Sequence, residues 1–280
     1  ATICKGATIT LSGGGASAYS WTGGISDGVI FSPTTTTTYT VTGTDINLCS
    51  NTLSQTVSVN VLPTVTITKA ETSGTANNDA TICEGATITL SGGGASTYSW
   101  TGGISDGVIF SPTTTTTYTL MGTDINSCSN TLSQTVSVNV LPAKPAVTSP
   151  AICEGQTATI TAPSGVYTYT WTVPTGVAAP GNVNTFSTTK AGTYSVTITN
   201  SNSCTSDIGV GTVVVNTLPT KPTVTSPIIC EGQTATITTP SGVYTYTWTV
   251  PTGVTAPGNV NTFSTTKAGT YSVTITNSNS

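Results

Sequence analysis

The sequence repeats itself, and this repetition constrains the fold more than any other feature. Residues 1–63 recur as residues 80–142 with five substitutions, and residues 143–203 recur as residues 220–280 with five more. Self-similarity at a period of this size is the mark of domains duplicated in series, each of which contacts mainly its neighbours. The chain is therefore expected to consist of two units of one type, here called A, followed by two units of a second type, B.

Both types share a signature, which fixes the expected domain boundaries. Each unit opens with a motif like Ile3–Gly6 (Ile-Cys-Lys/Glu-Gly), and its tryptophan lies 17 residues after the cysteine in A units and 18 in B units. Leu-Pro closes the units, because proline cannot donate to a strand ladder. These signals predict four domains: 1–63 (A type, without its first strand), 64–142 (A type), 143–219 (B type) and 220–280 (B type, without its last strand). The short, proline-containing joints favour a stiff, end-to-end arrangement.

Within each unit the residues alternate with a period of two, which predicts strands. In the third unit we expect strands over 157–161, 167–173, 193–199 and 213–215, with Tyr169 and Trp171 on one face and threonines on the other. Short strands separated by Pro- and Gly-containing turns every 8–12 residues are typical of a sandwich. The predicted fold class is all-β, with tandem immunoglobulin-like β-sandwich domains. The segment 69–79, which B units lack, is interpreted as an exposed polar loop.

Seven cysteines lie 45, 34, 45, 25, 51 and 26 residues apart, which does not match zinc-site spacing, and the chain has no His. Two cysteines per unit predict one disulfide per domain in an oxidising compartment. The expected bonds are Cys4–Cys49, Cys83–Cys128 and Cys153–Cys204, with Cys230 unpaired. Geometry leaves an alternative open, because the two cysteines of one sandwich could lie about 25 Å apart, whereas a bond needs Cα atoms within about 7 Å. The alternative bonds link neighbouring units: Cys4–Cys128 and Cys83–Cys204.

Aromatic residues recur at fixed places in every unit and are predicted to form the cores, with the tryptophans almost wholly buried. The core candidates are Trp21, Trp100, Trp171, Trp248, Tyr39, Tyr118, Tyr194 and Tyr271. The alternative for the tryptophans is a sugar-stacking platform. Their neighbours on alternate positions are Ser and Thr, which favours burial of the aromatic face.

The charged residues argue against catalysis and against several classes of ligand. Without His no Ser-His-Asp or Cys-His arrangement can form, and the acid at Glu84, Glu154 and Glu231 is replaced by Lys5 in the first unit. We therefore expect no enzyme and no cofactor. A net charge of −4 without a basic patch argues against nucleic acid, and no apolar run is long enough for membrane insertion. Asp45–Asn47, Asp124–Asn126 and Asn77–Asp79 offer too few oxygens for Ca²⁺ and are interpreted as turns.

The motif Gly192–Cys204, Gly-Thr-Tyr-Ser-Val-Thr-Ile-Thr-Asn-x-x-x-Cys, together with Ile-Cys-x-Gly and Tyr-x-Trp, resembles the PKD-like and Ig-like repeats of large secreted surface adhesins of Bacteroidetes, gliding adhesins among them. The Trp-x-Phe-Gly-Asp-Gly turn of PKD domains is absent. The resemblance implies PKD-like domains, export, cell-surface display, and adhesion or filament formation.

The expected function is a structural or adhesive segment of an extracellular filament or stalk. The alternative is a spacer or carbohydrate-binding array of a secreted polysaccharide-degrading enzyme. The expected partners are further repeats of the same polypeptide, other copies of the filament, or surface glycans. The chain is expected to be part of a longer polymer, because the cysteine that the fourth unit calls for would fall at position 281.

Overall fold

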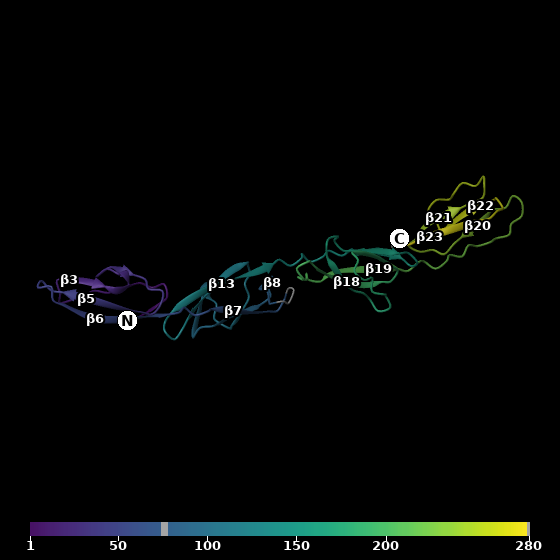
Figure 1. Ribbon diagram of the computed structural model, residues 1–280. Coiled ribbons are helices and arrows are strands. Elements are labelled where there is room, and N and C mark those ends of the chain that lie inside the picture. Colours follow the sequence, from purple (N-terminus) through teal and green to yellow (C-terminus); the bar gives the residue numbers. More distant parts are fainter. Residues whose placement is uncertain (74–77, 279–280) are drawn as a thin grey trace. The chain divides into compact units, whose positions relative to one another are not determined.

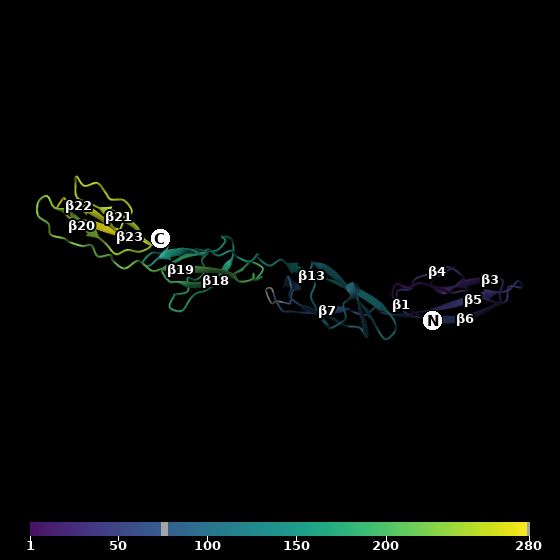
Figure 2. The same ribbon diagram turned by 180° about the vertical axis from the view of Figure 1, so that it is seen from behind.

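The structure is a computed structural model that describes residues 1–73 and 78–278. Among these residues the regular elements are β-strands, apart from two single-turn 3-10 helices, η1 (Thr22–Gly24) and η2 (Thr101–Gly103). The chain divides into two compact units, Ala1–Leu141 with Asn202–Cys204, and Pro142–Ser201 with Thr205–Ser280. The four sequence ranges are called repeats 1 to 4 below. Figures 1 and 2 show their strands, coloured from purple in repeat 1 to yellow in repeat 4.

Repeat 2 is a complete sandwich. One sheet has the order β10-β12-β13-β8 and the other β11-β9-β7. The strands are β7 (Thr66–Glu71), β8 (Thr81–Cys83), β9 (Ile88–Gly93), β10 (Thr97–Trp100), β11 (Ile109–Phe110), β12 (Thr116–Thr123) and β13 (Ser129–Asn139). β8 runs parallel to β13, and the other pairings are antiparallel. The chain thus enters along one sheet as β7 and crosses to the other as β8, and this strand order is immunoglobulin-like.

Repeat 1 has the same first sheet but a smaller second one. Its sheets are β1-β6-β5-β3 and β2-β4. The strands are β1 (Thr2–Cys4), β2 (Ile9–Thr10), β3 (Ala18–Trp21), β4 (Ile30–Phe31), β5 (Thr37–Thr44) and β6 (Ser50–Asn60). Residues 1–63 contain no counterpart of β7, so β2 has a strand neighbour on one side only.

Repeats 3 and 4 follow the same plan. Repeat 3 has sheets β14-β19-β18-β16 and β15-β17, and repeat 4 has the pairs β20-β22 and β21-β23. The strands are β14 (Ala151–Cys153), β15 (Ala158–Thr161), β16 (Thr168–Thr172), β17 (Thr185–Thr188), β18 (Gly192–Thr199), β19 (Gly209–Asn216), β20 (Ala235–Thr238), β21 (Thr245–Thr249), β22 (Thr262–Thr265) and β23 (Ser272–Thr276). The strands predicted in the third repeat are confirmed to within a few residues. Each strand pairing lies inside one predicted range, although the division into four domains stays a prediction.

The cores of repeats 3 and 4 are built on their tryptophans. Trp171 and Trp248 are 9% and 7% exposed and belong to the apolar clusters of their repeats. The indole N–H of Trp171 donates to the carbonyl of Val183 at 2.7 Å, and the ring meets Phe186 edge-on. Of the predicted core tyrosines, Tyr39, Tyr118 and Tyr194 are buried and Tyr271 is half-buried.

The expectation that all four tryptophans are almost wholly buried is wrong for Trp21 and Trp100, which are half-buried. Each donates its indole N–H to a carboxylate of a surface loop, Asp27 Oδ1 at 2.8 Å and Asp106 Oδ1 at 2.9 Å. A carboxylate remains hydrated wherever it can, because burying its charge is costly. This contact therefore holds one edge of the indole at the surface in A-type repeats.

The interpretation of segment 69–79 as a loop is wrong for its first three residues, which belong to β7. They pair with β9 in the register Lys69↔Leu90 to Glu71↔Ile88, and the Glu71 carboxylate accepts the backbone N–H of Ala80 at 2.9 Å. The alternation of apolar residues that begins at Val65 and Ile67 continues through this segment, and it determines the strand more strongly than the charges of Lys69 and Glu71 oppose it. Asn77, a candidate oxygen ligand, lies outside the described residues.

Thr239 provides a stability test inside the fourth repeat. Its side chain is 1% exposed and its Oγ1 has no hydrogen-bond partner among the described residues, whereas repeat 3 has the buried Ala162 at this position. A buried unpaired hydroxyl costs about 1–3 kcal/mol. We expect Thr239→Val to stabilise repeat 4 by about 1–2 kcal/mol, measured as slower amide hydrogen exchange in β20 and β22. The reverse change, Ala162→Thr, should speed exchange in β15; unchanged rates in both variants would contradict the expectation.

Candidate functional site: the cysteine bridges

Two disulfide bonds join residues of consecutive repeats. Cys4 is bonded to Cys128 and Cys83 to Cys204, each with a Cα–Cα distance of 5.5 Å. The expected bonds Cys4–Cys49, Cys83–Cys128 and Cys153–Cys204 are therefore wrong, and the alternative pairing is the one that forms. Each bond links the first cysteine of one repeat to the second cysteine of the next.

The length of the last strand in a repeat explains this pairing. Cys128 directly precedes β13, whereas Cys83 lies opposite Asn139 at the far end of that strand. Eleven residues of strand span about 35 Å, and a bond requires Cα atoms within about 7 Å. The two cysteines of one repeat thus cannot reach one another. Repeat 1 has the same arrangement, with Cys4 opposite Asn60 and Cys49 before β6.

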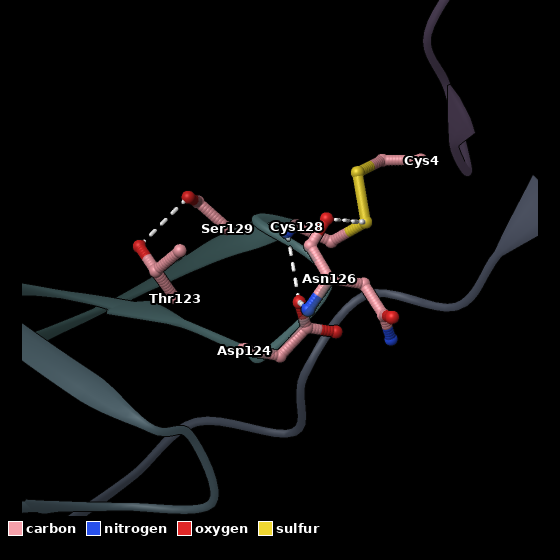
Figure 3. The surroundings of a disulfide bond; sticks show 6 residues. All are labelled: Cys4, Thr123, Asp124, Asn126, Cys128 and Ser129. Atoms are coloured by element: carbon pink, nitrogen blue, oxygen red, sulfur yellow. Dashed lines mark hydrogen bonds between the residues drawn. A yellow bond between two sulfur atoms is a disulfide. The ribbon is translucent and has the colours of Figure 1, made fainter. Parts of the chain in front are cut away.

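The second cysteine of an A-type repeat is held in place by a tight turn. In repeat 2, Asp124 Oδ1 accepts the backbone N–H groups of Asn126 and Cys128, both at 2.8 Å. Figure 3 shows Cys128 above this turn, with Cys4 reaching it from a separate segment. Asp45 makes the equivalent bonds in repeat 1. The carboxylates of Asp45 and Asp124 thus accept backbone hydrogen bonds within turns, as the sequence predicts.

Three cysteines are unpaired among the described residues, and they occupy the same positions as bonded ones. Cys49 and Cys230 are exposed and Cys153 is half-buried. Cys153 lies opposite Asn216 at the end of β19, just as Cys83 lies opposite Asn139. No group of three metal-ligating side chains occurs in the part of the chain that the structure describes. Each of these thiols therefore occupies a position at which a disulfide forms in another repeat, but it is not bonded to a second cysteine among the described residues.

A groove in repeat 1 was not foreseen from the sequence. It encloses about 580 Å³, and its walls include Leu11, Tyr19, Trp21, Val41 and Cys49. The only sequence signal for it is the lack, in residues 1–63, of a segment like 64–71. In repeat 2 the corresponding edge, that of β9, is paired with β7.

No protein-family model matches the chain, and no curated protein matches its sequence. Solved structures with similar arrangements include extracellular domains 3–5 of Drosophila OTK, at 13% identity and a TM-score of 0.32, covering 65% of this chain and 71% of that one. A Ca²⁺-stabilised, ice-binding adhesin of an Antarctic bacterium matches at 16% identity and a TM-score of 0.32, covering 82% and 73%. A fragment with domains 1–4 of ICAM-5 matches at 12% and 0.33, covering 95% and 88%.

Scores this low carry no argument about function. The immunoglobulin-like fold therefore rests on the strand order, in which β7 pairs with β9 while β8 pairs with β13.

None of the helices among the described residues has the length and apolar character needed to cross a membrane.

Proposed function

We propose that the chain is a structural and adhesive segment of a long extracellular repeat protein that forms a stalk or filament at the cell surface. The observation that carries this proposal is the pair of bonds Cys4–Cys128 and Cys83–Cys204, which tie repeat 1 to repeat 2 and repeat 2 to repeat 3. Disulfides of this kind persist in oxidising surroundings outside the cytosol. A bond between repeats does little for the core of either one, but it strengthens the connection along the chain.

The surface chemistry fits the same role. Only 6% of the residues are charged, and polar hydroxyl groups cover the strands: Thr38 pairs with Thr56 and Thr40 with Ser54, each at 2.8 Å between hydroxyl oxygens. Cross-strand hydroxyl pairs stabilise a sheet without long, flexible charged side chains. We include in the proposal the attribution to the Bacteroidetes adhesins whose repeats the sequence resembles.

The alternative, a carbohydrate-binding array, would require an open aromatic platform. Tyr19 and Trp21 do line the groove of repeat 1. Tyr98 and Trp100 hold the same places in repeat 2 and are half-buried as well, and Tyr98 donates to the carbonyl of Ala95 at 2.8 Å as Tyr19 does to that of Ala16 at 3.1 Å. In repeats 3 and 4, however, Trp171 and Trp248 are buried, so the half-buried tryptophan is not a feature common to all four repeats.

The proposal is tested by locating the native polypeptide with an antibody raised against repeat 3. We expect intact, unpermeabilised cells to be labelled, and a reducing gel to show a band several-fold larger than the 28.1 kDa of this chain. Antibody pre-absorbed with the chain is the control. Labelling that requires permeabilisation, or a band near 28 kDa, would overturn the proposal. Peptides of a hydrolase domain in the same band would favour the alternative.

A further inference from the structure

We propose that the native disulfides of this chain arise by rearrangement of earlier, non-native bonds, and that the partner of the chain during folding is a thiol–disulfide isomerase. The inference rests on the proposed function in one respect, because disulfides form where the surroundings are oxidising. It deepens that function by naming an enzyme class that must act before the repeats are joined. Its test uses the purified chain, so this test and the antibody test fail independently.

The first argument is the order of the bonded cysteines along the sequence. Cys4 is bonded to Cys128 and Cys83 to Cys204, so the two bonds interlace, and neither joins cysteines that are neighbours in the sequence. In an unfolded chain the probability that two residues meet falls roughly as the −3/2 power of the loop length. Cys83 and Cys128 are 45 residues apart, whereas the native loops span 124 and 121 residues. The non-native bond Cys83–Cys128 is therefore favoured about fourfold over either native bond.

The second argument is that this favoured bond is incompatible with the folded repeat. Cys83 lies opposite Asn139 at one end of β13, and Cys128 precedes the other end. The strand has 11 residues and keeps the two cysteines about 35 Å apart, far beyond the limit of about 7 Å between the Cα atoms of a disulfide. A chain that carries Cys83–Cys128 therefore cannot pair β8 with β13. Its sulfur atoms remain accessible in an unfolded repeat.

The third argument is the burial of the native bonds. Cys128 and Cys204 are 0% exposed, and Cys83 is 5% exposed. Exchange requires that a thiolate reach one of the two sulfur atoms of a disulfide, so a folded repeat protects its bonds, whereas a misbonded repeat does not. An isomerase therefore acts on misbonded chains, and exchange stops once the native pairing is reached.

The rearrangement is an exchange without net oxidation. A thiolate of the isomerase attacks Sγ of Cys128 in the Cys83–Cys128 bond, which forms a mixed disulfide and releases Cys83 as a thiolate. The Cys4 thiolate then attacks the same sulfur atom, so that Cys4–Cys128 forms and the isomerase thiolate leaves. Cys83 and Cys204 are joined by oxidation: their two protons and two electrons pass to a disulfide oxidant such as oxidised glutathione, which becomes two thiols.

The test uses the full chain with Cys49→Ser, Cys153→Ser and Cys230→Ser, which keeps the four bonded cysteines and allows three complete pairings. The reduced, denatured variant is diluted into diamide, an oxidant that supplies no thiol, and its bonds are identified by non-reducing peptide mapping. We expect most molecules to be misbonded, with Cys83–Cys128 the most frequent bond. Protein disulfide isomerase with reduced glutathione should then restore the native pairing about tenfold faster than the same glutathione alone.

A second variant, which also carries Cys83→Ser and Cys204→Ser, is the matched control. Only Cys4–Cys128 can form in it, so diamide alone should give the native bond, and the isomerase should not raise its yield. The native full chain, treated with isomerase and reduced glutathione, should keep both bonds. The proposal is overturned if diamide alone gives mainly the native pairing in the first variant, or if the isomerase does not convert its misbonded chains. It is also overturned if the isomerase raises the yield of the control as much, or scrambles the native chain.

Discussion

When the chain is stretched from its two ends with both disulfides intact, we expect the distance between Cys4 and Cys204 to be limited to the length of an extended segment of 45 residues. The bonds Cys4–Cys128 and Cys83–Cys204 turn this region into three covalent paths that run in parallel. The paths are the segments 4–83, 83–128 and 128–204, which span 79, 45 and 76 residues. The shortest path becomes taut first and sets the limit.

The expected change on reduction is large. At 3.3–3.6 Å per residue the 45-residue path reaches about 150–160 Å, whereas the 200 residues between Cys4 and Cys204 reach about 660–720 Å without the bonds. Single-molecule extension with and without a reductant measures the difference. Cys49→Ser is the control and should leave the oxidised length unchanged, because Cys49 is unpaired. A gain of about 45 residues in that variant would instead indicate a Cys4–Cys49 bond.

Replacing Trp171 by Ala should destabilise repeat 3 by about 3–5 kcal/mol. Trp171 is 9% exposed, the centroid of its ring lies 4.9 Å from that of Phe186, and its indole N–H donates to the carbonyl of Val183. Truncation leaves a cavity and an unpaired carbonyl. Because small domains are stable by only about 5–15 kcal/mol, much of the stability of this repeat would be lost. Amide hydrogen exchange in β16 and β18 should accelerate roughly 10²–10³-fold.

Trp21→Ala is the matched comparison for that experiment. Trp21 is half-buried and donates to Asp27, an acid on a surface loop, so its removal exposes less new apolar surface and leaves a carboxylate that water can solvate. We expect a clearly smaller acceleration of exchange in β3 and β5. Equal effects at Trp21 and Trp171 would contradict the distinction between the two types of core.

The sequence was sufficient for the strands predicted in repeat 3 but not for the contacts between side chains. Alternation over Tyr167–Val173 places β16 and its buried face correctly, because burial and period-two patterning have the same cause. The disulfide partners depend on the length of β13, which separates Cys83 from Cys128, and cysteine counting alone does not reveal that distance. The partial exposure of the Trp21 indole depends on its hydrogen bond to Asp27, an acid in a loop six residues away.

The position of β7 was missed for a similar reason. Lys69 and Glu71 suggested a solvated loop, yet their backbone pairs with β9. A strand at a sheet edge tolerates charged side chains, because one of its faces remains in water. In repeat 2 this strand pairs along the edge of β9, and β2, the counterpart of β9 in repeat 1, pairs with β4 alone among the described residues.

The three parallel paths between Cys4 and Cys204 also change what a protease can do to this protein. Exposed segments such as the turn at Asn47 and Leu48 are the places where proteases cut most readily. A cut between residues 4 and 83 leaves two other covalent routes across the same region, and a second cut between residues 128 and 204 still leaves one. The fragments stay joined until the disulfides are reduced. A protein with this connectivity stays in one piece after cuts that would divide a chain without such bonds.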